Sequence, residues 1–136
     1  MAAVSHQPLG HLVVTVEACF GLLFTPSWNT VTERPLISER YLDIILNGAR
    51  PDIRQHSIYG DIRQEGEKGN VYQWDMVWEN GDFMKGGWAG QGLMINPHKD
   101  LVAVWTGYFD EQGQEISILP MLRSIFAGVY PESDHE

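Results

Sequence analysis

The chain has 136 residues, with 9 Lys+Arg against 18 Asp+Glu and a formal net charge of −9, and it is long enough for a single domain with its own hydrophobic core. This acid excess argues against binding to nucleic acid or to an anionic membrane surface, because both need a surplus of cationic side chains. Cys19 is the only cysteine, so an intramolecular disulfide and a cysteine metal cluster are excluded.

The first predicted element is a helix over residues 15–23, within a stretch that is apolar from residue 12 to residue 24. The apolar residues near helical spacing are Leu12, Val16, Cys19, Phe20 and Leu23. We expect the Cys19 thiol to be buried and inert, because free cysteine packs as a small hydrophobe. The stretch is short for a membrane span and no Lys or Arg precedes it, so we expect no targeting segment, no membrane partner and a cytoplasmic location.

A second helix is predicted to begin after Ser38, whose side chain suits the N-cap position. Its apolar face is formed by Tyr41, Leu42, Ile45 and Leu46. Gly48 is placed where a left-handed cap would end this helix. Residues 49–70 are polar and rich in turn formers, so we interpret them as one long loop.

Beyond residue 70 the hydrophobic period changes to two. Tyr72, Trp74, Met76 and Trp78 occupy alternate positions, which predicts a half-buried strand, and Asn80-Gly81 predicts a hairpin turn. Residues 82–95 and 101–106 are the second and third predicted strands. The glycines of the second strand leave open a competing interpretation, in which residues 82–90 form an irregular loop and the strand begins only afterwards.

The last predicted element is a helix with Ser117 as its N-cap and Pro120 in its first turn. Its apolar stripe consists of Leu119, Leu122, Ile125, Phe126 and Val129. The stripe is expected to pack on one face of the strands. The predicted fold is therefore a single α+β domain over residues 1–136, with a three-stranded antiparallel meander, a C-terminal helix packed on it and N-terminal helices.

Residues 81–107 contain the triplet Lys85-Gly86-Gly87, a glycine-rich strand, the Asn96-Pro97 turn and a hydrophobic strand. This series resembles the third conserved segment of serine hydrolases of the β-lactamase and penicillin-binding-protein type, in which a Lys-Thr-Gly or His-x-Gly triplet lines the active site. Residues 20–28, 36–42 and 72–74 resemble other segments of that family, in the same order. The resemblance extends over residues 11–130. It implies a fold equivalent to the C-terminal part of such an enzyme.

The resemblance also implies substrate-binding roles for Lys85, Gly86, Gly87 and Trp88. Lys85 would hold a substrate carboxylate or tune the base, and the backbone near Trp88 would supply an oxyanion donor. Gly86 stands where the family usually has Thr or Ser, and the lost hydroxyl favours an esterase or amide hydrolase over a lactamase. The alternatives are that Lys85 is an exposed strand lysine and that the glycines belong to a bulge.

The family's chemistry needs a serine followed by a lysine three residues later on one helix, so that the amine can take the hydroxyl proton. No serine of this sequence has that neighbour, and we assign no catalytic residue. Ser27-Trp28-Asn29 satisfies the spacing of the family's Ser-x-Asn element, but its place directly after the first helix is wrong for the role. The 5 histidines fit no ligand spacing, so neither a metal nor a cofactor is expected.

The sequence thus favours a C-terminal fragment or degenerate copy of a β-lactamase-related serine hydrolase, inactive by itself. The parent would hydrolyse a small-molecule ester or amide through an acyl-serine. The alternative is a non-catalytic binding or self-associating interaction module. A partial fold leaves apolar surface uncovered, so we expect self-association through that surface.

Overall fold

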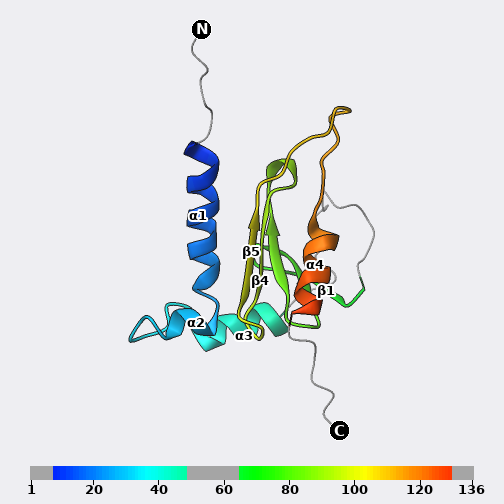
Figure 1. Cartoon of the computed structure of the whole chain (residues 1–136). Coiled ribbons are helices and arrows are strands. Elements are labelled where there is room, and N and C mark those ends of the chain that lie inside the picture. The colour runs from blue at the N-terminus through cyan, green and yellow to red at the C-terminus, as the bar shows by residue number, and fades with distance from the viewer. Residues whose placement is uncertain (1–7, 49–64, 130–136) are drawn as a thin grey trace.

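The computed structural model describes residues 8–48 and 65–129 and contains one five-stranded antiparallel sheet. The strands are β1 Glu67–Val71, β2 Trp74–Trp78, β3 Phe83–Gly86, β4 Gly92–Asn96 and β5 Leu101–Trp105. Each strand pairs with the next in the chain, so the sheet is a meander with β3 at its centre (Figure 1). The α+β class and the meander are confirmed, whereas the prediction of three strands is wrong.

The two additional strands have separate origins. β1 lies at the end of the segment predicted as a loop, residues 49–70, of which residues 49–64 lie outside the described part of the chain. The predicted strand over residues 82–95 is divided into β3 and β4 by a short 3-10 helix, Trp88–Gly90. Ala89 and Gly90 adopt φ values of 59° and 74°, and these left-handed conformations reverse the chain.

The predicted alternation along the first strand is also incorrect. Tyr72 lies in the turn between β1 and β2, with φ of 51°. Trp74 and Met76 should share one face, but Trp74 packs in one core cluster and Met76 in the other. The pairing of β1 with β2 carries two register shifts, and such bulges change the face on which side chains emerge.

Helices cover both faces of the sheet. They are α1 Pro8–Leu22, α2 Pro26–Asn29, α3 Glu39–Asn47 and α4 Leu119–Gly128. α1 stands along one face, where it contacts β4 and β5, and α4 lies on the opposite face (Figure 1). α3 crosses the end of the sheet and contacts β2 (Figure 1). No helix within the described ranges is long and apolar enough to cross a bilayer.

α1 begins earlier than predicted, and its packing face is different. Gly21 faces the sheet, because a Cβ there would lie 2.6 Å from the Val102 side chain. Cys19 is exposed, so the expected buried thiol is a wrong prediction. Val16 and Phe20 are 60% and 48% exposed. α1 is apolar on more than one side, so the sequence pattern did not indicate which side meets the sheet.

The helix ends agree in part with the sequence. Ser38 caps α3, since its Oγ accepts a hydrogen bond from the Tyr41 N–H at 3.2 Å. Gly48 has φ of −93°, so it is not the predicted left-handed cap. The residue before α4 is Ile118 rather than Ser117, whereas Pro120 does lie in the first turn of α4.

The core consists of two clusters, one on each face of the sheet. The cluster beneath α1 and α3 contains Phe24, Ile45, Val71, Trp74, Val77, Phe83, Leu93 and Ile95. The cluster beneath α4 contains Met76, Trp78, Met84, Met94, Trp105, Leu119 and Phe126. Apolar side chains on both faces of the sheet are therefore buried. Removal of apolar surface from water is the main favourable contribution to folding.

Candidate functional site

A pocket of about 340 Å³ lies on the face of the sheet that α1 partly covers. It is lined by Glu17 and Phe20 of α1, Tyr41 of α3, Gln73, Trp74, Lys85, Gly86, Gly87, Gln91, Gly92 and Leu93. Three of the four residues that sequence analysis assigned to substrate binding, Lys85, Gly86 and Gly87, are therefore neighbours on its wall. The size is within the range of small-molecule sites.

Lys85 is in β3, the central strand, where it pairs with Leu93 of β4. The structure thus contradicts the alternative in which residues 82–90 form a loop. Because Met84 packs beneath α4, its neighbour Lys85 emerges on the opposite face, toward the pocket. Its side chain is 44% exposed.

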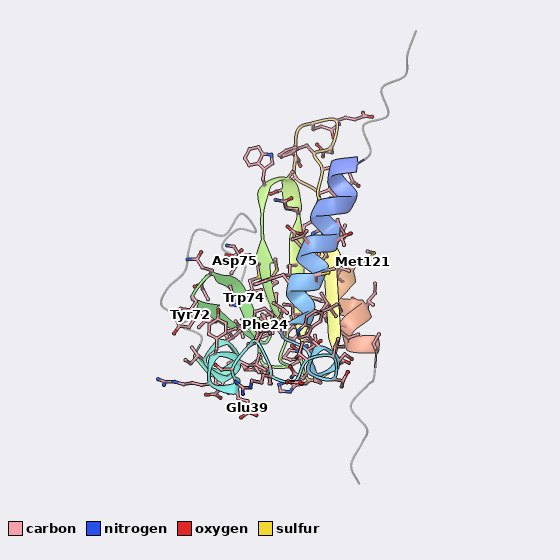
Figure 2. The ribbon with its side chains drawn as sticks, turned by 90° about the vertical axis from the view of Figure 1, so that its left-hand side faces the viewer. Phe24, Glu39, Tyr72, Trp74, Asp75 and Met121 are labelled. Carbon is pink, nitrogen blue, oxygen red and sulfur yellow. The ribbon has the colours of Figure 1, made fainter. Side chains whose placement is uncertain are left out.

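Asp75 of β2 binds both Lys85 and the strand end beside it. Its Oδ1 lies 2.7 Å from the Lys85 Nζ, and its Oδ2 accepts the Gly86 N–H at 2.8 Å. Asp75 is 22% exposed, so this ion pair is partly shielded from water. Figure 2 shows Asp75 and Trp74 beside α1 rather than beneath it. The ammonium group of Lys85 is therefore compensated before any ligand arrives.

The turn after β3 is held in place by its own contacts. The Gly87 N–H donates to the Gln91 carbonyl oxygen at 2.9 Å, and the Trp105 indole N–H donates to the Gly90 carbonyl oxygen at 2.6 Å. Gly107 lies so close to the turn that a Cβ there would be 1.5 Å from the Ala89 carbonyl oxygen. This close backbone approach requires glycine at position 107.

The Trp88 side chain is not part of the pocket that the other three predicted site residues line. It is 80% exposed, and its ring makes an edge-to-face contact with Phe109 at a centroid distance of 5.7 Å. Its indole is thus part of the outer surface of the turn.

The rest of the pocket wall includes the aromatic residues Phe20, Tyr41 and Trp74. Phe24 supports Trp74 from below, with ring centroids 5.4 Å apart in an edge-to-face arrangement. Phe20 makes the same kind of contact with Phe24, also at 5.4 Å. The aromatic part of the wall is therefore continuous with the core cluster through Phe24 and Trp74.

No serine of the described segments lines the pocket. Ser27 lies in α2, where its N–H donates to Asp100 Oδ1 at 3.1 Å and its hydroxyl donates to Oδ2. These hydrogen bonds, the hydroxyl one first, lower the pKa of the Asp100 carboxyl. Ser27 therefore fastens α2 to the β4–β5 turn. The pocket is large enough for a small molecule, and the described side chains that line it include no serine or cysteine nucleophile.

Within residues 8–48 and 65–129, no three His, Cys, Asp or Glu side chains lie close enough together to hold a metal ion. Comparisons with protein-family models, with curated proteins and with solved structures gave no match.

Sequence reasoning did not find Glu17, Phe20 or Tyr41 as pocket residues, nor Asp75 as the partner of Lys85. Val77 pairs with Phe83 and Met76 with Met84, and this register, continued by one pair, puts Asp75 opposite Lys85. A two-residue Asn80-Gly81 hairpin would instead place residue 78 opposite residue 83. The one-residue difference concealed the ion pair, although an acid and a lysine near one hairpin were a usable signal.

Proposed function

We propose that this chain is the C-terminal portion, or a degenerate copy, of a serine hydrolase of the β-lactamase and penicillin-binding-protein type. The parent would hydrolyse a small-molecule ester or amide through an acyl-serine. The observation that carries the proposal is the position of Lys85. The residue that resembles the family's triplet lysine is on the central strand of an antiparallel meander and borders a pocket of about 340 Å³.

The order of elements also supports the proposal. Helices precede an antiparallel meander and a terminal helix packs on it, which is the order of elements that the resemblance implies. The sequence contains no Ser-x-x-Lys. We therefore assign substrate binding to this chain and the acyl-serine step to the parent.

The second candidate is a binding module without catalysis. It is favoured by Asp75, which occupies both the Lys85 ammonium and the Gly86 N–H. Groups already satisfied in this way are poor catalytic donors, because a substrate must displace the carboxylate first.

The purified chain is expected not to hydrolyse nitrocefin or p-nitrophenyl esters above the buffer rate, because its sequence contains no Ser-x-x-Lys that would place a lysine base beside a serine nucleophile. Initial rates and labelling by a fluorophosphonate probe provide the measurement. An acyl-enzyme burst of one equivalent that disappears on substitution of a single serine would contradict the expectation and show an unrecognised nucleophile.

Self-association tests the fragment proposal. α1 has exposed apolar side chains, including Val16 at 60% and Phe20 at 48%, and a partial fold is expected to bury them against another copy. Light scattering at increasing concentration is expected to show an oligomer, which Val16→Ser together with Phe20→Ser would weaken. A wild-type monomer at high concentration would count against the fragment and favour an independent module.

The coding DNA on the 5′ side of Met1 tests the origin directly. The fragment proposal expects a Ser-x-x-Lys codon series there, either in frame or displaced by a frameshift. Its absence over the length of such a domain would leave the degenerate copy and the binding module as the remaining explanations.

A further inference from the structure

The charges around the pocket favour a cation over an anion. Among the lining residues the ionisable carboxylate is Glu17 and the ammonium is Lys85. Asp75 is directly behind Lys85 and pairs with it at 2.7 Å. Two carboxylates therefore stand against one ammonium. The charges of Lys85 and Asp75 cancel, so the Glu17 carboxylate leaves the pocket with a net negative charge.

Three donors on the part of the wall formed by β3 and its turn already have acceptors within the protein. Lys85 donates to Asp75 Oδ1, the Gly86 N–H donates to Asp75 Oδ2, and the Gly87 N–H donates to the Gln91 carbonyl oxygen. An anionic ligand at these donors would lie near two carboxylates and would compete with these hydrogen bonds. Both effects oppose its binding.

Glu17 and the aromatic residues of the lining suit a positive charge. In the described segments Glu17 forms no ion pair, and it faces the pocket from α1. Phe20, Tyr41 and Trp74 supply aromatic rings around the same space. Aromatic faces carry negative potential and attract ammonium groups, most strongly where water is partly excluded. The apolar wall would hold the hydrocarbon part of the same ligand.

We propose that this pocket binds a small organic cation, an ammonium group attached to an apolar body, with Glu17 as the counter-charge and the aromatic wall as the apolar contact. The inference rests on the proposed function only in treating this pocket as the ligand site, and it names the substrate class as amine-bearing. Lys85 then serves to neutralise Asp75 and not to hold a substrate carboxylate.

Isothermal titration calorimetry with benzyltrimethylammonium, benzyl alcohol and phenylacetate tests the proposal. The cation is expected to bind at least about tenfold more tightly than phenylacetate, because an ammonium over aromatic rings gains on the order of one tenfold step in affinity. Benzyl alcohol is expected to lie between them. Tighter binding of phenylacetate, or binding of none of the three probes, would overturn the proposal.

Single substitutions test which charged residues determine ligand binding. Glu17→Gln is expected to weaken cation binding by about fivefold or more, while Glu33→Gln, at an exposed position outside the pocket, leaves it unchanged. Lys85→Met is expected to strengthen cation binding, because Asp75 becomes free. A Lys85→Met variant that keeps its circular dichroism spectrum but loses phenylacetate binding would instead make Lys85 an anion site.

The two proposals fail independently. Calorimetry alone measures cation binding, whereas probe labelling and the coding DNA test the hydrolase origin. A pocket that prefers phenylacetate would overturn the ligand class and leave the origin standing. A missing Ser-x-x-Lys series would overturn the fragment origin and leave the ligand class standing.

Discussion

Replacing Phe83 with alanine is expected to lower the free energy of unfolding by about 3–5 kcal/mol, the usual cost of removing a large buried aromatic side chain. Phe83 is in the central strand and is 0% exposed. Its ring makes edge-to-face contacts with Trp74 at 4.6 Å and with Phe24 at 5.7 Å. The loss is a large part of the roughly 5–15 kcal/mol that stabilises an ordinary domain.

Urea denaturation followed by circular dichroism at fixed protein concentration provides the measurement. Phe109→Ala is the matched control, since Phe109 is 43% exposed and packs on the surface turn, and it is expected to cost less than about 1 kcal/mol. Because Phe83 supports Trp74 in the pocket wall, Phe83→Ala is also expected to weaken ligand binding. Equal stability of the two variants would mean that Phe83 is not in the core.

Replacing Asp82 with alanine is expected to cost about 2–4 kcal/mol, because buried hydrogen bonds to a charged group are lost and their donors remain. Asp82 is 1% exposed. Its carboxylate accepts the Asn96 amide at 2.7 Å and the Asn80 amide at 2.9 Å. Asn96 in turn accepts the Lys99 N–H at 2.9 Å. The carboxylate therefore joins the β2–β3 turn to the β4–β5 turn.

Asp43→Ala is the control for this network, because Asp43 is an exposed carboxylate of α3 that accepts one side-chain hydrogen bond, from Asn47. Its expected change is within about 0.5 kcal/mol. Urea midpoints at one protein concentration compare the two variants. A loss at Asp82 as small as that at Asp43 would show that water replaces the carboxylate and that the turns are held by packing.

The sequence alone determined the elements whose signals are local. Ser38 begins α3 because a side-chain oxygen can satisfy an N–H that the helix leaves unpaired. Gly81 forms the β2–β3 turn with φ of 86°, a conformation that glycine adopts at little cost. Pro120 lies in the first turn of α4, where its missing N–H is not needed. Each choice depends on neighbours a few residues away.

Strand number and register were decided by the tertiary structure. β1 is polar in part, with the sequence Glu-Lys-Gly-Asn-Val, and becomes a strand because β2 offers it a paired edge. β3 and β4 are separate strands because Gly90, at φ of 74°, lets the chain fold back at the turn that Gly107 and Trp105 hold. No alternation of apolar residues encodes these events, since they depend on backbone partners far along the chain.

The residues of the candidate site can also be separated into those that a local sequence pattern predicts and those that only the tertiary structure brings together. Lys85-Gly86-Gly87 could be selected from the sequence, because a lysine beside two glycines in a strand is a local pattern. The pairing of Lys85 with Asp75 depends on a register that one residue would change, and a one-residue slip reverses the face of every side chain. Glu17, Phe20 and Tyr41 reach the pocket only because α1 and α3 pack beside the central strands. The charge of the pocket, and with it the class of ligand, is thus a property of the folded chain.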